Sequence, residues 1–206
     1  MLFRLFIGLL TCSIVLLATD FDFENAKLPT SWKVQTTGSN TNLATWEVQR
    51  EENNSILTIT KIESSLFSIG GTFNLFFTKD INLKDGEISV DFRANTGRID
   101  QGGGIMWRVI DKDNYYVARF NPLEDNFRFY SVMDGHRKEL KSATIKLNKG
   151  WHRMKIIQNG NHFEGYINGK KLLEANNNSI AKAGGVGLWT KADAATSFDN
   201  FKAESK

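Results

Sequence analysis

Alternation of apolar and polar residues with a period of two runs through most of this chain, and it is the feature that most limits the possible folds. The segments ISVDFRA (88–94), YYVARF (115–120) and WHRMKII (151–157) show it. Successive side chains of a β-strand point to opposite faces, so the pattern predicts strands with one buried face. Turn sequences such as DKDN (111–114) and QNGN (158–161) separate these segments at hairpin intervals. We therefore predict an all-β fold of two antiparallel sheets packed face to face.

The first 18 residues have a different character from the rest of the chain. Arg4 precedes an apolar run from Leu5 to Leu17, which is too short to span a bilayer comfortably. We predict a cleaved signal peptide over residues 1–18, one domain over residues 19–206, and no stable membrane span after cleavage. The only cysteine, Cys12, lies in this segment, and a lipidated Cys12 is the alternative. A mature chain without disulfides fits a secreted or periplasmic bacterial protein.

Charge and motif content exclude several classes of function. The formal net charge is +3, whereas a nucleic-acid-binding domain would carry a strong basic excess. The chain has no HExxH motif and no cysteine after residue 18, which argues against a zinc site. We expect a monomer that binds neither nucleic acid nor a catalytic metal.

Three arginines occur in neighbouring predicted strands, at positions that place them on one face. If residues 111–114 form a four-residue loop, antiparallel pairing sets Arg108 opposite Val117 and Met106 opposite Arg119. Pairing across the next turn sets Arg119 opposite Arg128. The side chains predicted to share this face are Arg108, Tyr115, Arg119, Asn121, Arg128 and Tyr130.

This polar face allows two interpretations. Pairing Phe92 with Trp107 would add Asp91 to it, and arginines directly opposite each other destabilise a sheet unless an opposite charge lies nearby. The face is then either an ordinary wet surface with local ion pairs, or a ligand groove. In a groove, guanidinium groups, tyrosine rings and amides would contact the hydroxyls and ring faces of sugars, or the carboxylates of uronic acids.

Three longer segments carry a family resemblance, namely WRVIDKDNYYVARFNPLEDN, WHRMK with HFEGYINGKKL, and GGVGLWTKADAATSFDNF. Together they resemble secreted bacterial concanavalin A-like jelly-roll proteins that are labelled family 16 glycoside hydrolase-like. These are related to the 3-keto-disaccharide hydrolase domain and to laminin G-like modules. The resemblance implies a two-sheet antiparallel jelly-roll sandwich with a glycan groove on its concave sheet. It places Trp189, Lys191 and Asp193 at the rim of that groove.

The sequence favours binding over catalysis. True family 16 glycosidases carry an E-x-D-x-x-E run on one strand, and no glutamate here begins such a run. We therefore predict a lectin-like domain that holds a glycan, with Trp189 as a stacking platform at the groove. One alternative is a glycoside hydrolase or 3-keto-disaccharide hydrolase that uses Asp91, Glu124 or Asp125 as acid or base. The other is a laminin G-like protein-interaction module.

A structural calcium ion is the only cofactor that the sequence suggests. FDFENAKLPTSW near the start and SFDNF near the end resemble jelly-roll carbohydrate modules in which an early glutamate and a late aspartate hold calcium. The resemblance implies Glu24 and Asp199 as its ligands, with backbone carbonyls completing the oxygen shell. Two solvated carboxylates at strand ends are the alternative.

Overall fold

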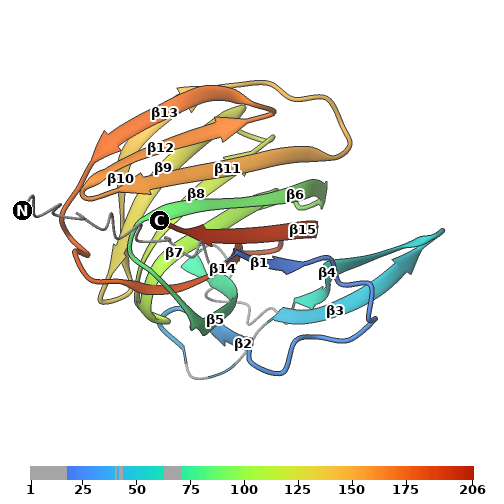
Figure 1. Ribbon diagram of the computed structural model, residues 1–206. Coiled ribbons are helices and arrows are strands. Elements are labelled where there is room, and N and C mark those ends of the chain that lie inside the picture. Colours follow the sequence, from blue (N-terminus) through green and yellow to red (C-terminus); the bar gives the residue numbers. More distant parts are fainter. Residues whose placement is uncertain (1–17, 40, 42–43, 63–70) are drawn as a thin grey trace, which may run out of the picture.

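The fold is a sandwich of two antiparallel sheets, which confirms the predicted fold class (Figure 1). The computed structural model describes residues 18–39, 41, 44–62 and 71–206. Within these ranges every regular element is a strand, and nothing in them forms a helix of the length and apolarity that a membrane crossing requires. Residues 1–17 of the predicted signal peptide, Cys12 included, lie outside the described residues.

The first sheet contains both ends of the described chain. Its strands, in the order β13–β12–β11–β6–β15–β4–β3 with β1 also paired to β15, are β1 (Ala18–Phe21), β3 (Ala44–Glu51), β4 (Asn54–Ile62), β6 (Gly86–Thr96), β11 (His152–Asn159), β12 (His162–Ile167), β13 (Lys170–Asn176) and β15 (Ala195–Ser205). Figure 1 shows the hairpin of β3 and β4 reaching beyond the rest of the sandwich.

The second sheet lies behind the first in Figure 1 and carries the predicted arginine strands. Its strands, in the order β10–β9–β8–β7–β14–β5–β2, are β2 (Lys33–Thr36), β5 (Phe73–Leu83), β7 (Gly103–Asp111), β8 (Asn114–Asn121), β9 (Asn126–Met133), β10 (His136–Thr144) and β14 (Gly184–Lys191).

The main core lies between the two sheets and is rich in aromatic rings. Trp107 of the second sheet has its ring centre 5.5 Å from that of Phe163 in the first sheet. Its Nε1 donates a 2.7 Å hydrogen bond to Oε1 of Gln158, so the polar atom of this buried indole is satisfied. Burying one large apolar side chain contributes about 1.5–3 kcal/mol, and this core fixes which face of each strand points inward.

The outer face of the second sheet is also apolar in part. A separate buried cluster is drawn only from strands of that sheet, and so it lies on the face turned away from the first sheet. Its members are Phe73, Leu75, Phe77, Met106, Val109, Tyr115, Val117, Tyr130, Val132 and Trp189. The predicted division of β8 into core residues and outward residues is confirmed, but its outward face is not simply a wet polar surface.

The hairpin of β8 and β9 has the predicted register. Arg119 lies directly opposite Arg128, Val117 opposite Tyr130, and Phe120 opposite Phe127. Because side chains alternate along a strand, Arg119 and Arg128 share the outer face of the second sheet.

The hairpin of β7 and β8 does not have the predicted register. Met106 lies opposite Val117 and Gly104 opposite Arg119, so the predicted pairing of Met106 with Arg119 is wrong. Asp111 pairs with Asn114, so the turn has two residues, and the register shifts before Trp107 meets Tyr116. Arg108 has a left-handed backbone (φ 47°) inside this bulge. A bulge inserts residues on one strand and re-aims their side chains, so Val109 joins the outer cluster. The prediction that Arg108 shares a face with Arg119 is therefore wrong.

The predicted pairing of Phe92 with Trp107 is wrong as well. Phe92 lies in β6 of the first sheet, where its partners are His152 and Phe198. The connection after β6 crosses to the other layer, and β7 instead pairs with β14 and β8. Asp91 consequently belongs to the first sheet and not to the arginine face.

Close approach between strands explains the glycines at the start of β7. A Cβ atom on Gly104 would lie 1.9 Å from the backbone oxygen of Ala118 in β8, far inside contact distance. Gly104 therefore lets two strands pack together, and the second sheet has no room there for a side chain.

Candidate functional site

The two opposed arginines share one carboxylate. Glu124, in the turn between β8 and β9, places Oε2 at 3.3 Å from Nη2 of Arg119 and at 3.1 Å from Nη1 of Arg128. This bridging charge offsets the repulsion that facing arginines would otherwise cause. The side chain of Arg119 is 1% exposed, whereas those of Glu124 and Arg128 are 45% and 30% exposed. Of the two arginines, Arg119 is therefore buried, and Arg128 is accessible to solvent together with Glu124.

Asp100 is the buried counter-charge of this site. Its Oδ2 lies 3.1 Å from Nζ of Lys191 and 3.9 Å from Nη2 of Arg119. Its Oδ1 accepts a 3.0 Å hydrogen bond from Nδ2 of Asn121. We call Asp100, Arg119, Glu124, Arg128 and Lys191 the arginine cluster. Paired and hydrogen-bonded charges of this kind are the form in which ions are tolerated in protein interiors.

Arg119 is hydrogen-bonded on only one side. Its Nε and Nη1 atoms are buried and have no hydrogen-bond partner. A buried donor without a partner costs about 1–3 kcal/mol, and more when the group is charged. Nε and Nη1 point to different sides of the guanidinium, so each is a separate donor for an oxygen acceptor.

A third arginine lies on the same face, over aromatic rings. The guanidinium carbon of Arg137, in β10, lies 4.3 Å from the ring centre of Tyr130, 5.1 Å from Phe73 and 5.8 Å from Trp189. Rings at these distances attract a cation through their negative faces. Nη1 of Arg137 is also buried without a hydrogen-bond partner. Burial lowers the pKa of Arg137, and the positive charge of Arg119 lowers it further.

The three predicted aromatic residues, Tyr115, Tyr130 and Trp189, are part of the buried outer cluster and not of an exposed platform. Trp189 lies inside β14 and is fully buried, and its Nε1 donates a 3.1 Å hydrogen bond to the hydroxyl of Tyr115. Burial raises the pKa of Tyr115 well above its usual value. The prediction that Trp189 is a stacking platform at the rim of a groove is therefore wrong. Trp189 instead forms part of the wall around Arg137.

Glu124 is held in its ionised form. Burial alone would raise the pKa of Glu124, but the hydrogen bond from Asn126 and the charges of Arg119 and Arg128 outweigh it and lower that pKa. A carboxylate with a lowered pKa can act as an acceptor, a base or a nucleophile, whereas a general acid needs a raised pKa.

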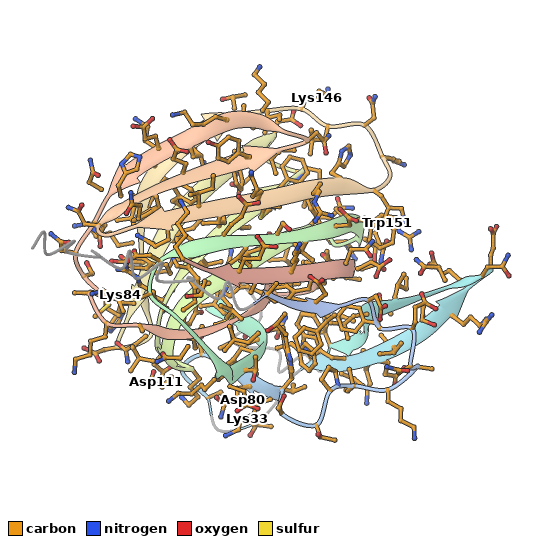
Figure 2. The ribbon with its side chains drawn as sticks, in the orientation of Figure 1. Lys33, Asp80, Lys84, Asp111, Lys146 and Trp151 are labelled. Atoms are coloured by element: carbon orange, nitrogen blue, oxygen red, sulfur yellow. The ribbon has the colours of Figure 1, made fainter. Side chains whose placement is uncertain are left out.

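Arg108 serves the fold at the other end of the sandwich. Its guanidinium donates to the backbone oxygens of Lys84 (2.9 Å), Gly160 (2.6 Å) and Ile180 (2.8 Å). It therefore joins three connections between strands. Figure 2 shows Lys84 at the end of the molecule opposite Trp151. The bulge in β7 directs the side chain there, which removes Arg108 from the arginine cluster.

The predicted carboxylates divide between the two sheets. Asp91 accepts hydrogen bonds from Arg153 and Asn200 on the outer side of the first sheet, so it is separated from Glu124 by the core. Asp125 is the left-handed residue of the turn after Glu124 (φ 47°), and the described contacts do not join its carboxylate to the arginine cluster. Of the predicted acidic residues, the structure brings only Glu124 to the cluster.

Sequence reasoning missed Asp100 and Arg137. Asp100 belongs to the connection between β6 and β7, for which the sequence analysis predicts no site residue. Asp193 now shows how that connection is held, because its carboxylate accepts hydrogen bonds from the backbone N–H groups of Arg98 (2.8 Å), Ile99 (3.0 Å) and Asp100 (3.0 Å). The run DQGGG, an acid directly before a strand entrance, was the available signal.

The anchoring by Asp193 predicts a pH-dependent stability. Burial raises the pKa of Asp193, but three backbone N–H donors outweigh it and lower the value in the folded state. A lowered folded pKa contributes stability above the unfolded pKa of about 3.9, and that stability is lost as the pH falls through the folded value. We expect Asp193→Asn to cost about 1–3 kcal/mol at pH 7, by urea unfolding, and almost nothing near pH 2. A difference that stays constant with pH would contradict this role.

A cavity of about 490 Å³ lies at the loop end of the sandwich, next to the core residues Phe92 and Phe120, and no residue of the arginine cluster lines it. It is within the range of about 300–1,000 Å³ that is typical of small-molecule sites. Gln101 and Pro122, which line it, directly follow Asp100 and Asn121 along the chain. Its other polar lining groups include Asn95 and His152.

Two groups of carboxylates bear on metal binding. Glu24 accepts a hydrogen bond from the backbone N–H of Ser55, and Asp199 accepts one from Nδ2 of Asn54, so both predicted calcium ligands lie at the start of β4. Burial raises the pKa of Asp199, and the negative charges of Asp91 and Glu24 raise it further. These groups therefore repel one another.

The other group is His162, Glu164 and Glu174, whose ligand atoms lie within 4.8 Å of one another. The ammonium of Lys171 already bonds Glu164 at 2.9 Å and Glu174 at 2.8 Å. A lysine therefore supplies the positive charge that a metal ion would bring.

Residues 21–204 match the family model of the 3-keto-alpha-glucoside-1,2-lyase-like domain. Among solved structures, the carbohydrate binding module CBM66 from Bacillus subtilis has a TM-score of 0.64 at 18% identity, covering 84% of this chain and 95% of that one. The Bacillus licheniformis beta-glucanase has a TM-score of 0.61 at 12% identity, covering 92% of this chain and 98% of that one.

Domain 4 of AbnA, a GH43 extracellular arabinanase from Geobacillus stearothermophilus solved with arabinotriose, has a TM-score of 0.61 at 10% identity and covers 90% of each chain. At such identities these likenesses show the jelly-roll fold. No curated protein matches the chain in sequence.

Proposed function

The chain belongs to the family of the 3-keto-alpha-glucoside-1,2-lyase-like domain, and from this premise we propose that it is a secreted carbohydrate-binding domain. The glycan lies on the outer face of the second sheet, at the arginine cluster, and is held without being cleaved. The observation that carries this proposal is the buried Arg119 whose Nε and Nη1 atoms have no partner. A site with unpaired donors suits a ligand rich in oxygen acceptors.

Two structural neighbours support a carbohydrate ligand. One is named as a carbohydrate binding module, and another was solved with a bound arabinotriose. The same fold thus serves sugar binding elsewhere, while the chemistry of the site has to come from the residues of this chain.

Removing the Arg119 fork should weaken glycan binding. We expect Arg119→Ala to reduce the affinity about 10- to 150-fold, because a hydrogen bond to a charged group is worth about 1.5–3 kcal/mol. Arg153→Ala, which removes an arginine of the first sheet paired with Asp91, is the matched control and should bind normally. Calorimetry on glycans chosen from an array measures both. Absence of any glycan ligand, with a protein partner found on the same face, would select the laminin G-like alternative instead.

An enzyme that cleaves a glycoside, by hydrolysis or by elimination, is the second candidate. The family is named for a lyase that acts on glucosides, and two carboxylates meet at this site. Asp100 and Glu124 both lie within 4 Å of Nη2 of Arg119. That arrangement fits the separations of about 5–9.5 Å between the carboxyl groups of glycosidases. Turnover of ordinary or 3-keto disaccharides that disappears in Glu124→Gln would favour catalysis over binding.

We also propose a structural calcium ion at Glu24 and Asp199. The proposal is supported by their mutual repulsion, which a cation would relieve. Calcium at 100 times its dissociation constant should stabilise the fold by about 2.7 kcal/mol, seen as a higher melting temperature than in EDTA. Asp199→Asn should remove that difference. An equal melting temperature of the wild-type protein in calcium and EDTA would refute the site.

A further inference from the structure

We propose that the glycan carries a carboxylate and that this group binds between Arg119 and Arg137 on the outer face of the second sheet. The inference rests on the proposed function and adds the chemical class of the sugar, a uronic acid. It is carried by hydrogen-bond donors that the protein itself leaves unpaired and by a surplus of positive charge around them.

The donors come from two guanidinium groups on the same face. Arg119 offers Nε and Nη1, and Arg137 offers Nη1, all three buried and without a partner. The side chain of Arg119 is 1% exposed, so these donors lie inside the face and not at its surface. The charge of Arg119 lowers the pKa of Arg137, which shows that the two groups are near enough to repel each other. An anion between them would relieve both the repulsion and the missing bonds.

The charges around the site leave room for one more negative group. Among the described residues, the cations are Arg119, Arg128, Arg137 and Lys191, and the carboxylates that pair with them are Asp100, Glu124 and Glu139. One positive charge is therefore left over, and a ligand carboxylate would balance it. A neutral sugar would supply acceptors without the charge.

The surroundings fit a sugar acid better than a small inorganic anion. Arg137 lies over the rings of Tyr130, Phe73 and Trp189, so the site has apolar walls beside its cations. Glu124 is 45% exposed, and the only atom of Arg119 that it bonds is Nη2. The accessible edge of the arginine cluster therefore lies beside Glu124. In the proposed site one oxygen of the ligand carboxylate accepts from Arg119 and the other accepts from Arg137.

The test compares sugars that differ only in the carboxylate. Oligosaccharides of galacturonic, glucuronic and mannuronic acid are titrated by calorimetry, each beside its carboxyl-reduced neutral form. We expect at least one acidic form to bind 10-fold or more tightly than its reduced form. In Arg119→Lys, which keeps the charge and removes the fork, that preference should fall to about 2-fold or less. Arg153→Lys, on the first sheet, should keep the preference.

The outcomes separate the inference from the proposed function. Equal affinity for acidic and reduced sugars in the wild-type protein would overturn the carboxylate site and leave glycan binding intact. No binding of any acidic or neutral glycan would overturn both. Because the comparison between ligands uses the wild-type protein, it decides the question even if Arg119→Lys does not fold.

Discussion

Replacement of Arg108 by methionine is expected to lower the free energy of unfolding by about 3–5 kcal/mol, the scale of losing one partner of a buried charged network. The backbone oxygens of Lys84, Gly160 and Ile180 would lose the guanidinium that joins them. Methionine preserves much of the apolar length, so the loss reports hydrogen bonds and not a cavity. Urea unfolding followed by tryptophan fluorescence measures it.

The matched control for Arg108→Met is Arg128→Met. Arg128 is 30% exposed and its ion pairs are partly solvated, so we expect a cost below about 1 kcal/mol. Similar losses in the two variants would contradict the structural role of Arg108. Unchanged stability with weakened glycan binding in Arg108→Met would restore it to the ligand face.

Asp100→Asn is expected to have an effect of similar size, about 3–5 kcal/mol, at the other end of the second sheet. The neutral amide would leave Lys191 and the buried Arg119 without their shared counter-charge. The change keeps the shape of the side chain, so it isolates the charge. Chemical unfolding at pH 7 is the measurement.

Asp80→Asn provides the comparison for Asp100→Asn. Asp80 is exposed (Figure 2), and its neutralisation should change stability by less than about 0.5 kcal/mol. An equally small effect at Asp100 would mean that Glu124 alone neutralises Arg119, and the arginine cluster would then have no buried acidic centre.

The register of the β8–β9 hairpin could be predicted from sequence because it follows from one short turn. Once the PLED turn is placed, the pairing of Arg119 with Arg128 follows from constant spacing. The division of β8 into core and outer residues follows from alternation. These local rules are sufficient wherever a strand is regular and its partner is adjacent in the chain.

Arg108 and Asp91 were misplaced for two different physical reasons. The bulge at Arg108 keeps the apolar and polar pattern of β7 but changes where its side chains point, so alternation does not reveal it. The error at Asp91 came from pairing β6 with its neighbour in sequence. The true partner of β7 is β14, more than 70 residues later, and such a crossover between layers leaves no local signal.

Trp189 shows a third limit of predicting the site from the alternation of apolar and polar residues. Its position on the outer face of the second sheet agrees with alternation, but a two-residue period does not say whether that face is covered. Arg137 was overlooked because β10 reads as a polar edge strand, and its place over Tyr130 depends on packing across the sheet. The chemistry of the site therefore depends on contacts that the sequence pattern does not encode.

The pairing of Ala18 with Glu204 brings the first and last described strands together in one layer. The arginine cluster lies on the far side of the other layer. A tether, fusion partner or solid support joined at Lys206 would thus attach behind the sandwich, and the domain would present its guanidinium face outward. Surface-coupled assays can accordingly be oriented through the carboxyl end without blocking the surface on which sugars are to be tested.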